Sequence, residues 1–175
     1  MKIKLKLLSV ILFIFLNQSF VLAQEKIMFL DVDYIFSKSN LGKDIRQQID
    51  NKAKNLNIEK KKYKISIDKE KKEIFTKKNI ISNDDYKNKI SILENKIKDI
   101  NDKVSKKNKS FLEFKRNAEL QFSKKLTEIL QEYVNDNNIQ MIVNKKNILI
   151  GKSEFDTTPD ILSLLDKKVK KLKIK

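Results

Sequence analysis

The sequence predicts a mainly α protein with a small β body, into which a long antiparallel helical hairpin, a coiled-coil arm, is inserted. The chain of 175 residues has only two glycines, Gly42 and Gly151, and one proline, Pro159, so residues 43–150 contain neither. Apolar residues recur at helical spacing through most of that stretch, whereas short β-prone runs lie before and after it. A many-stranded sandwich or barrel needs glycine or proline turns at short intervals, so the sequence excludes both.

The first 23 residues have the three parts of a secretory signal peptide. Lys2, Lys4 and Lys6 precede an apolar run at 7–16 (LLSVILFIFL), and small residues then lead to Ala23. We expect cleavage between Ala23 and Gln24 and export of the protein. The alternative is an uncleaved N-terminal anchor, although ten apolar residues are short for a span of about 20.

The residue types that are missing exclude several classes of site. The chain has no His and no Cys, so zinc sites of Cys and His, Ser-His-Asp triads, cysteine nucleophiles and disulfides are impossible. Asp31 and Asp33 are the only closely spaced carboxylates near a strand end, and Asp84 and Asp85 are adjacent and so do not face one another on a helix. We expect neither pair to be catalytic, no enzymatic activity, and no metal or cofactor.

The first body segment covers residues 24–40. Residues 26–31 (KIMFLD) are predicted to form a short strand, and residues 32–39 a helical turn with Asp33 as N-cap. Residues 40–42 (NLG) mark a corner before the arm.

The arm is predicted to cover residues 41–136, with its tip at about 76–85. In the first helix, 41–78, the spacing of the apolar residues alternates between four and three from Ile49 onward, which is typical of a coiled coil. Ser82 and Asp85 resemble a capping box that begins the second helix. The apolar positions of the two helices are Leu41, Ile45, Ile49, Ala53, Leu56, Tyr63, Ile67 and Ile74, and then Tyr86, Ile90, Leu93, Ile97, Ile100, Val104, Phe111, Phe114 and Ala118.

A turn centred near Ile80 predicts which residues face one another along the hairpin. The expected pairs are Ile74 with Tyr86, Ile67 with Leu93, Tyr63 with Ile97, Lys60 with Ile100, Leu56 with Val104 and Ile49 with Phe111. Lys60, Glu70 and Lys107 interrupt the apolar seam and are expected to loosen it locally. At 1.5 Å per residue, the first helix makes an arm about 55 Å long.

The second body segment covers residues 137–175. Residues 139–143 (IQMIV) and 147–150 (NILI) are predicted to form two strands joined by a hairpin turn at 144–146, with Gly151 ending the second. Pro159, with Thr158 as N-cap, begins a last helix whose apolar face includes Ile161, Leu165, Val169 and Leu172, followed by a Lys-rich tail. Three short strands cover their apolar faces poorly in one chain, so we expect an oligomer.

Positive charge is concentrated on the first arm helix near the tip. The net charge is +16, and residues 60–78 hold nine Lys against three acids, hence +6. Such a patch attracts acidic proteins or anionic lipid, although a solvated helix face explains it as simply. An A/T-biased genome explains the high Lys count but not where the charge lies. The predicted contact residues are Lys60, Lys61, Lys62, Lys64, Lys71, Lys72, Lys77 and Lys78, with the off-seam apolar residues Ile65, Phe75, Ile80 and Ile81.

Nearly all of the chain after the signal peptide resembles the Skp/OmpH family of periplasmic chaperones for outer membrane proteins. The resemblance depends on KIMFLDVDYIFSKSNLGKDI, on the charged helical hairpin, and on the ending NNIQMIVNKKNILIGKSEFDTTPDILSLLDK, in that order. The family's Asp-Ile-Thr element reads Asp156-Thr157-Thr158 here, so this corner departs from the pattern. The family's basic lipopolysaccharide-binding cluster has no residue-by-residue match.

The resemblance implies a jellyfish-like homotrimer whose three arms enclose a cavity. It implies a periplasmic holdase that binds unfolded outer membrane β-barrel proteins without ATP, with anionic lipid or lipopolysaccharide as a further contact. Two other functions compete with it: a membrane-anchored coiled-coil stalk, if the signal is retained, and a nucleic-acid-binding protein. Export and the presence of only two Arg argue against specific nucleic-acid binding.

Overall fold

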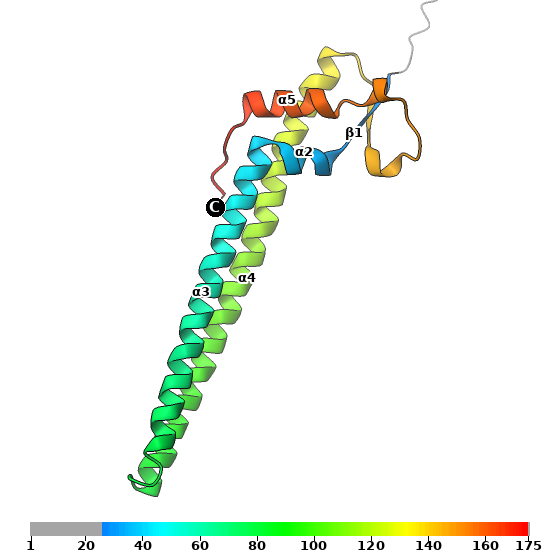
Figure 1. The fold of residues 1–175 in the computed structure, drawn as a ribbon. Helices are drawn as coiled ribbons and strands as arrows, with labels where there is room; N and C mark the ends of the chain where they lie inside the picture. Colours follow the sequence, from blue (N-terminus) through cyan, green and yellow to red (C-terminus); the bar gives the residue numbers. More distant parts are fainter. Residues whose placement is uncertain (1–25, 175) are drawn as a thin grey trace, which may run out of the picture.

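The structure, a computed structural model, describes residues 26–174 and consists of a small body from which one long helical arm projects (Figure 1). The predicted signal peptide and the Ala23–Gln24 cleavage site lie outside the described residues. The elements in chain order are β1 (Ile27–Leu30), α2 (Val32–Lys38), α3 (Asn40–Thr76), α4 (Asn83–Asp136), β2 (Met141–Asn144), the 3₁₀ turns η1 (Lys145–Asn147) and η2 (Ser153–Phe155), and α5 (Thr158–Lys168).

The arm is an antiparallel pair of α3, with 37 residues, and α4, with 54 residues. The prediction of two long helices is confirmed, and each observed end lies within three residues of the predicted one. The Ser82 hydroxyl accepts a hydrogen bond from the Asp85 backbone N–H at 3.1 Å, as the capping-box pattern indicated. The base of α4 extends past the start of α3 and packs against the body.

The predicted pairing of the two arm helices is wrong by one heptad. Ile67 lines a groove with Ile100, not Leu93, and Tyr63 lines the same groove with Val104. Residues 77–81 continue α3 as turns, with the Ile81 N–H donating to the Lys77 carbonyl, so the chain reverses nearer Ser82 than Ile80. A seven-residue repeat looks the same after a shift of seven, which is why apolar spacing alone could not separate the two registers.

Charged seam residues distinguish the two registers. In the observed one, Glu59 pairs with Lys107 and Glu70 pairs with Lys96 across the arm. The predicted register would have set Lys60 against Ile100 and left these charges without partners. Two of the three charged residues that were expected to loosen the seam, Glu70 and Lys107, therefore form ion pairs across the arm. The third, Lys60, is half-buried beside them.

The sheet of the body has two strands, β1 and β2, which pair in parallel from Ile27 opposite Met141 to Leu30 opposite Asn144. The predicted hairpin of two C-terminal strands is wrong. The Asn144 side chain accepts a hydrogen bond from the Lys146 N–H at 3.1 Å, which turns the chain into η1 instead. Residues 148–150 then form no strand, and the sheet in the described part of the chain consists of β1 and β2 alone.

Helix α2 is capped by Asp31, not by Asp33 as predicted. The Asp31 carboxylate accepts a hydrogen bond from the Tyr34 N–H at 2.9 Å, and Asp33 is the second residue of the helix. The corner between α2 and α3 is Ser39, one residue earlier than predicted. Gly42 is needed because a Cβ there would lie 1.9 Å from the Phe36 carbonyl oxygen.

Helix α5 begins after Thr157, so Thr158 is its first residue and not its cap. It ends at Lys168, earlier than predicted, and Val169 and Leu172 belong to an extended tail.

The core of the body lies where α2, α5 and the bases of α3 and α4 meet, and Phe36 and Phe122 pack edge-to-face in it at 4.8 Å. Its fully buried apolar residues include Leu30, Ile35, Leu41, Ile45, Ala118, Ile161 and Leu165.

Candidate functional site

The residues predicted to contact other molecules all lie on the distal half of α3 or in the tip turn, residues 77–82, at the end of the arm far from the body (Figure 1). Seven of the eight predicted Lys are exposed: Lys61, Lys62, Lys64, Lys71, Lys72, Lys77 and Lys78. Lys60 differs because it is half-buried at the seam. The structure therefore presents a dense positive surface on the distal arm.

Three of the four predicted apolar contact residues are largely exposed, and the fourth is half-buried. Phe75 is 70% exposed and Ile80 is 80% exposed, both next to the basic residues of the tip turn. Ile65 is 58% exposed further up α3, while Ile81 is half-buried. Ammonium groups beside large apolar side chains suit weak contacts with a partner that is both apolar and acidic.

Four further apolar side chains on the arm were missed by the sequence analysis: Ile58, Ile92, Leu112 and Leu120, each 45–63% exposed. A sequence signal existed for three of them. Ile58, Ile92 and Leu120 each follow a seam residue by two positions, as Ile65 follows Tyr63. A residue two positions past the seam lies off the line that faces the partner helix, so an apolar residue there is partly exposed, although Ile92 still lines a groove with Ile74 of α3.

Cross-arm ion pairs set the electrostatics of the middle of the arm. The Glu59 carboxylate accepts from the Lys107 ammonium, and the Tyr63 hydroxyl donates to it at 2.8 Å. The hydrogen bond from Lys107, with that from Tyr63, holds the pKa of Glu59 below its ordinary value. Glu59 is thus kept ionised and neutralises a seam Lys, so the charge available to a partner comes from the exposed Lys.

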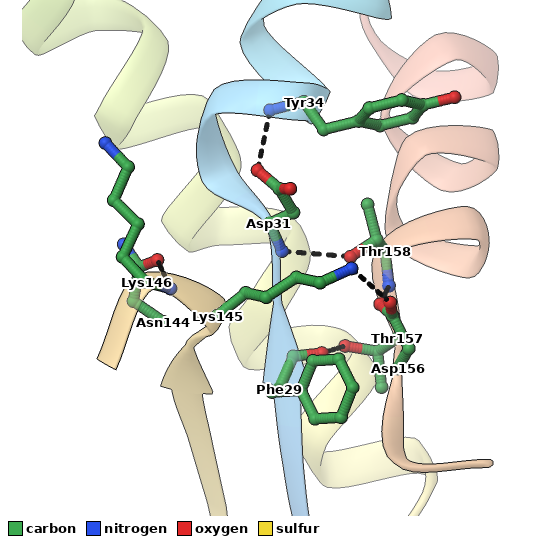
Figure 2. Close-up of polar contacts among 9 residues, drawn as sticks. All are labelled: Phe29, Asp31, Tyr34, Asn144, Lys145, Lys146, Asp156, Thr157 and Thr158. Carbon is green, nitrogen blue, oxygen red and sulfur yellow. Dashed lines mark hydrogen bonds and ion pairs between the residues drawn. The ribbon is translucent and has the colours of Figure 1, made fainter. Parts of the chain in front are cut away.

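The departure from the family pattern at residues 156–158 forms a connected polar corner of the body (Figure 2). The Phe29 carbonyl accepts from the Thr157 N–H at 2.9 Å and from the buried Thr157 hydroxyl at 3.0 Å. The Thr158 hydroxyl accepts from the Asp31 N–H at 2.9 Å. These bonds join β1 to the start of α5, so the element fastens the first body segment to the second.

Asp156 completes this corner. Its carboxylate accepts from the Thr158 N–H at 2.9 Å and from the Lys145 ammonium at 3.1 Å. Burial raises the pKa of Asp156, but the hydrogen bonds from Thr158 and Lys145 outweigh it, so the pKa is below its ordinary value. Asp156 is therefore ionised in the folded body and does structural work there.

The carboxylates at the end of β1 also have structural partners. Asp31 caps α2, and Asp33 forms an ion pair with Lys146. Among residues 26–174, no group of three or more His, Cys, Asp or Glu side chains is placed to hold a metal ion. Over the same residues, the structure has no helix that is both long and apolar enough to cross a membrane.

The body has an exposed apolar surface of its own. Leu149 and Ile150 are 103% and 94% exposed, in the segment that was predicted to be a strand. Met141 on β2 is also exposed, and β2 has no second strand beside it within the described chain. On the other edge, β1 is covered by a bridge between Phe29 and Asp156. The free edge of β2 and the apolar pair Leu149-Ile150 are thus available to another chain.

Comparisons with known proteins agree with this architecture. Residues 26–165 match the family model described as outer membrane protein (OmpH-like). Among solved structures, a protein described as an OmpH-like outer membrane chaperone of Caulobacter crescentus superposes with a TM-score of 0.81 at 17% sequence identity, covering 87% of this chain and 90% of that one. At that identity the likeness shows the fold. No curated protein sequence matches the chain.

Proposed function

We propose that this chain, which belongs to the OmpH-like (Skp) family of outer membrane protein chaperones, is an ATP-independent holdase for unfolded outer membrane proteins. The proteins of this family are periplasmic and are not enzymes. The observation that carries the proposal is the distal arm. There, the large apolar side chains of Phe75, near the end of α3, and of Ile80, in the tip turn, are exposed among exposed Lys.

Such a surface can hold an unfolded chain without selecting one sequence. Each exposed apolar side chain adds a small burial energy, and each Lys adds a screened attraction to acidic groups. Many weak contacts keep apolar segments apart while leaving each contact easy to release. Anionic lipid or lipopolysaccharide would be attracted by the same Lys, so we include a membrane contact of the tip in the proposal.

We further propose that three copies assemble through their bodies, with the arms projecting to enclose a space. The free edge of β2 and the exposed Leu149-Ile150 pair support this, because an unpaired edge and exposed apolar side chains favour pairing with another chain. Cleavage between Ala23 and Gln24 would release the protein into the periplasm. Mass spectrometry of the purified N-terminus tests this cleavage and separates the chaperone from an anchored stalk.

The deciding experiment is suppression of aggregation. An outer membrane β-barrel protein is diluted from denaturant, and its light scattering is followed with increasing amounts of the purified protein. We expect scattering to be abolished near one trimer per client. Continued aggregation at that ratio would exclude the holdase function.

Two variants assign the activity to the arm or to the body. Phe75→Ser with Ile80→Ser is expected to weaken suppression several-fold while the mass in solution is unchanged, since both side chains lie at the tip. Leu149→Ser with Ile150→Ser is expected to lower the mass in solution instead. If the tip variant suppresses aggregation as well as the parent, these tip residues are not client contacts.

A further inference from the structure

The C-terminal tail does not extend into solvent but packs along the base of the arm. After α5 ends at Lys168, residues 169–174, here called the strap, run back beside α3 (Figure 1). The Leu172 N–H donates to the Asp44 carboxylate at 3.2 Å, and its carbonyl accepts from the Gln48 amide at 2.7 Å. The Ile174 N–H donates to the Gln48 side-chain oxygen at 3.3 Å.

The strap has one face on the protein and one in water. Ile174 is 8% exposed and belongs to the same buried cluster as Ile45, and Leu172 is partly buried against that cluster. Lys171 and Lys173, which alternate with them, are exposed. This two-residue alternation is that of an extended segment lying on a surface. The strap lies beyond the part of the chain that the family model matches, residues 26–165.

The strap and α5 together hold both arm helices where they leave the body. The Asp166 carboxylate accepts from the Asn40 N–H at 2.7 Å, at the start of α3. On the other helix, the Tyr133 hydroxyl donates to the Asp160 carboxylate at 2.8 Å. The α5 contact with α3 lies at the very start of that helix, whereas the strap reaches one to two turns further along it, to Asp44 and Gln48.

We propose that the strap is a latch that fixes the direction of the arm relative to the body. Its few hydrogen bonds and three inward side chains, of which only Ile174 is buried, make it much easier to open than the core beneath α5, so it detaches while α5 stays docked. Opening removes the outermost support of α3 and lets the arm tilt. Because α3 is about 55 Å long, a tilt of about 10° moves the tip by about 10 Å.

Distances between a body label and an arm label test the latch. The chain has no cysteine, so Glu154→Cys in the body and Asn57→Cys on α3, both at exposed positions, accept spin labels as the sole pair. Labelled chains are diluted with unlabelled ones, so that only distances within a chain are measured. Releasing the strap by Leu172→Ser with Ile174→Ser is expected to broaden the distribution by about 4 Å, as a 10° tilt acting over about 25 Å of helix requires.

Two further variants keep the test decisive. Lys171→Ser with Lys173→Ser changes the outward face of the same strap and should leave the distribution unchanged. Gln48→Ala removes two strap hydrogen bonds at a helical position where Ala is well tolerated, and should broaden the distribution in the same direction but less. An unchanged distribution in both releasing variants, or equal broadening in the outward-face variant, overturns the latch. The readout is a distance, so it is independent of any chaperone activity.

Discussion

The arm and the body of this protein are stabilised differently. Between residues 51 and 113 of the arm, only Ile74, Leu93 and Ile100 are buried. The body, by contrast, buries side chains from α2, α3, α4 and α5 in one cluster, and several of them are fully inaccessible. The arm therefore depends on helix formation and a narrow seam, whereas the body depends on contacts between distant parts of the chain.

The small core of the arm lets it present many exposed side chains, whereas the larger core makes the body the rigid part of the molecule. A two-helix arm has too little core to resist bending, but it can expose apolar and basic side chains on most of its surface without losing stability. The body must supply the stability that the arm lacks. Its long-range hydrogen bonds, such as those between Thr157, Thr158 and the β1 segment (Figure 2), connect residues more than 100 positions apart.

The largest contrast is expected from truncating one Leu in each region. Leu165 is fully buried in the body, so Leu165→Ala should lower the free energy of unfolding by about 3 kcal/mol. Leu56 is half-buried in the arm seam, so Leu56→Ala should cost only about 1 kcal/mol. Urea denaturation measures both. Equal losses would show that the arm and the body are not stabilised differently.

A smaller loss is expected from Gly42→Ala, at about 2 kcal/mol, because the added Cβ meets the Phe36 carbonyl 1.9 Å away and the backbone must shift. The matched control is Asn51→Ala, at an exposed position of the same helix. Ala is the better helix former, so this control should be neutral or slightly stabilising. If thermal unfolding shows Gly42→Ala to be stabilising, the close contact of α2 with α3 is wrong.

The register of the arm can be tested with cysteine pairs. Ile67→Cys with Ile100→Cys places the thiols in the same groove and should form a disulfide on mild oxidation. Ile67→Cys with Leu93→Cys corresponds to the register shifted by one heptad and should remain reduced. Mass spectrometry after thiol alkylation distinguishes the two, and cross-linking of the second pair alone would restore the register predicted from apolar spacing.

The smallest effect is expected from Tyr133, which joins α4 to α5. Burial, together with its hydrogen bond to Asp160, raises the pKa of Tyr133 from 10.0 to about 12. The folded state thus retains this proton more tightly than the unfolded state, so the contribution to stability is complete below pH 10 and is lost as the pH rises towards 12. Thermal unfolding at several alkaline pH values should show this decline in the parent. In Tyr133→Phe, an equally steep decline would assign it to other groups.

Much of the arm followed from the sequence because helix periodicity and capping are local. The seven-residue spacing placed both helices within three residues of their ends, and Ser82 with Asp85 placed the start of α4. The exposed Lys and the exposed Phe75 and Ile80 were also found, since a position off the seam faces solvent. Whether these residues contact a client remains a prediction.

The body was predicted less well because its elements depend on distant partners. Residues 147–150 have a strand-like composition but form no strand in residues 26–174, and β2 pairs in parallel with a strand at the other end of the sequence. The caps at Asp31 and Thr157 were each misplaced by one or two residues. The docking of the strap onto Asp44 and Gln48 had no counterpart in the predictions, although the alternation of Leu172 and Ile174 with Lys is visible in the sequence.

By itself, the sequence determined that this protein has a long helical hairpin set into a small body, because a stretch without glycine or proline and with a heptad of apolar residues has few other stable forms. The tertiary structure alone decided the register of that hairpin, the parallel pairing of β1 with β2, and the path of the strap. Each of these depends on which distant groups meet: Glu59 with Lys107, Phe29 with Val143, and Leu172 with Gln48. Apolar positions that repeat every seven residues fit equally well when one helix is shifted by seven residues along the other. The ion pairs across the arm distinguish the two registers.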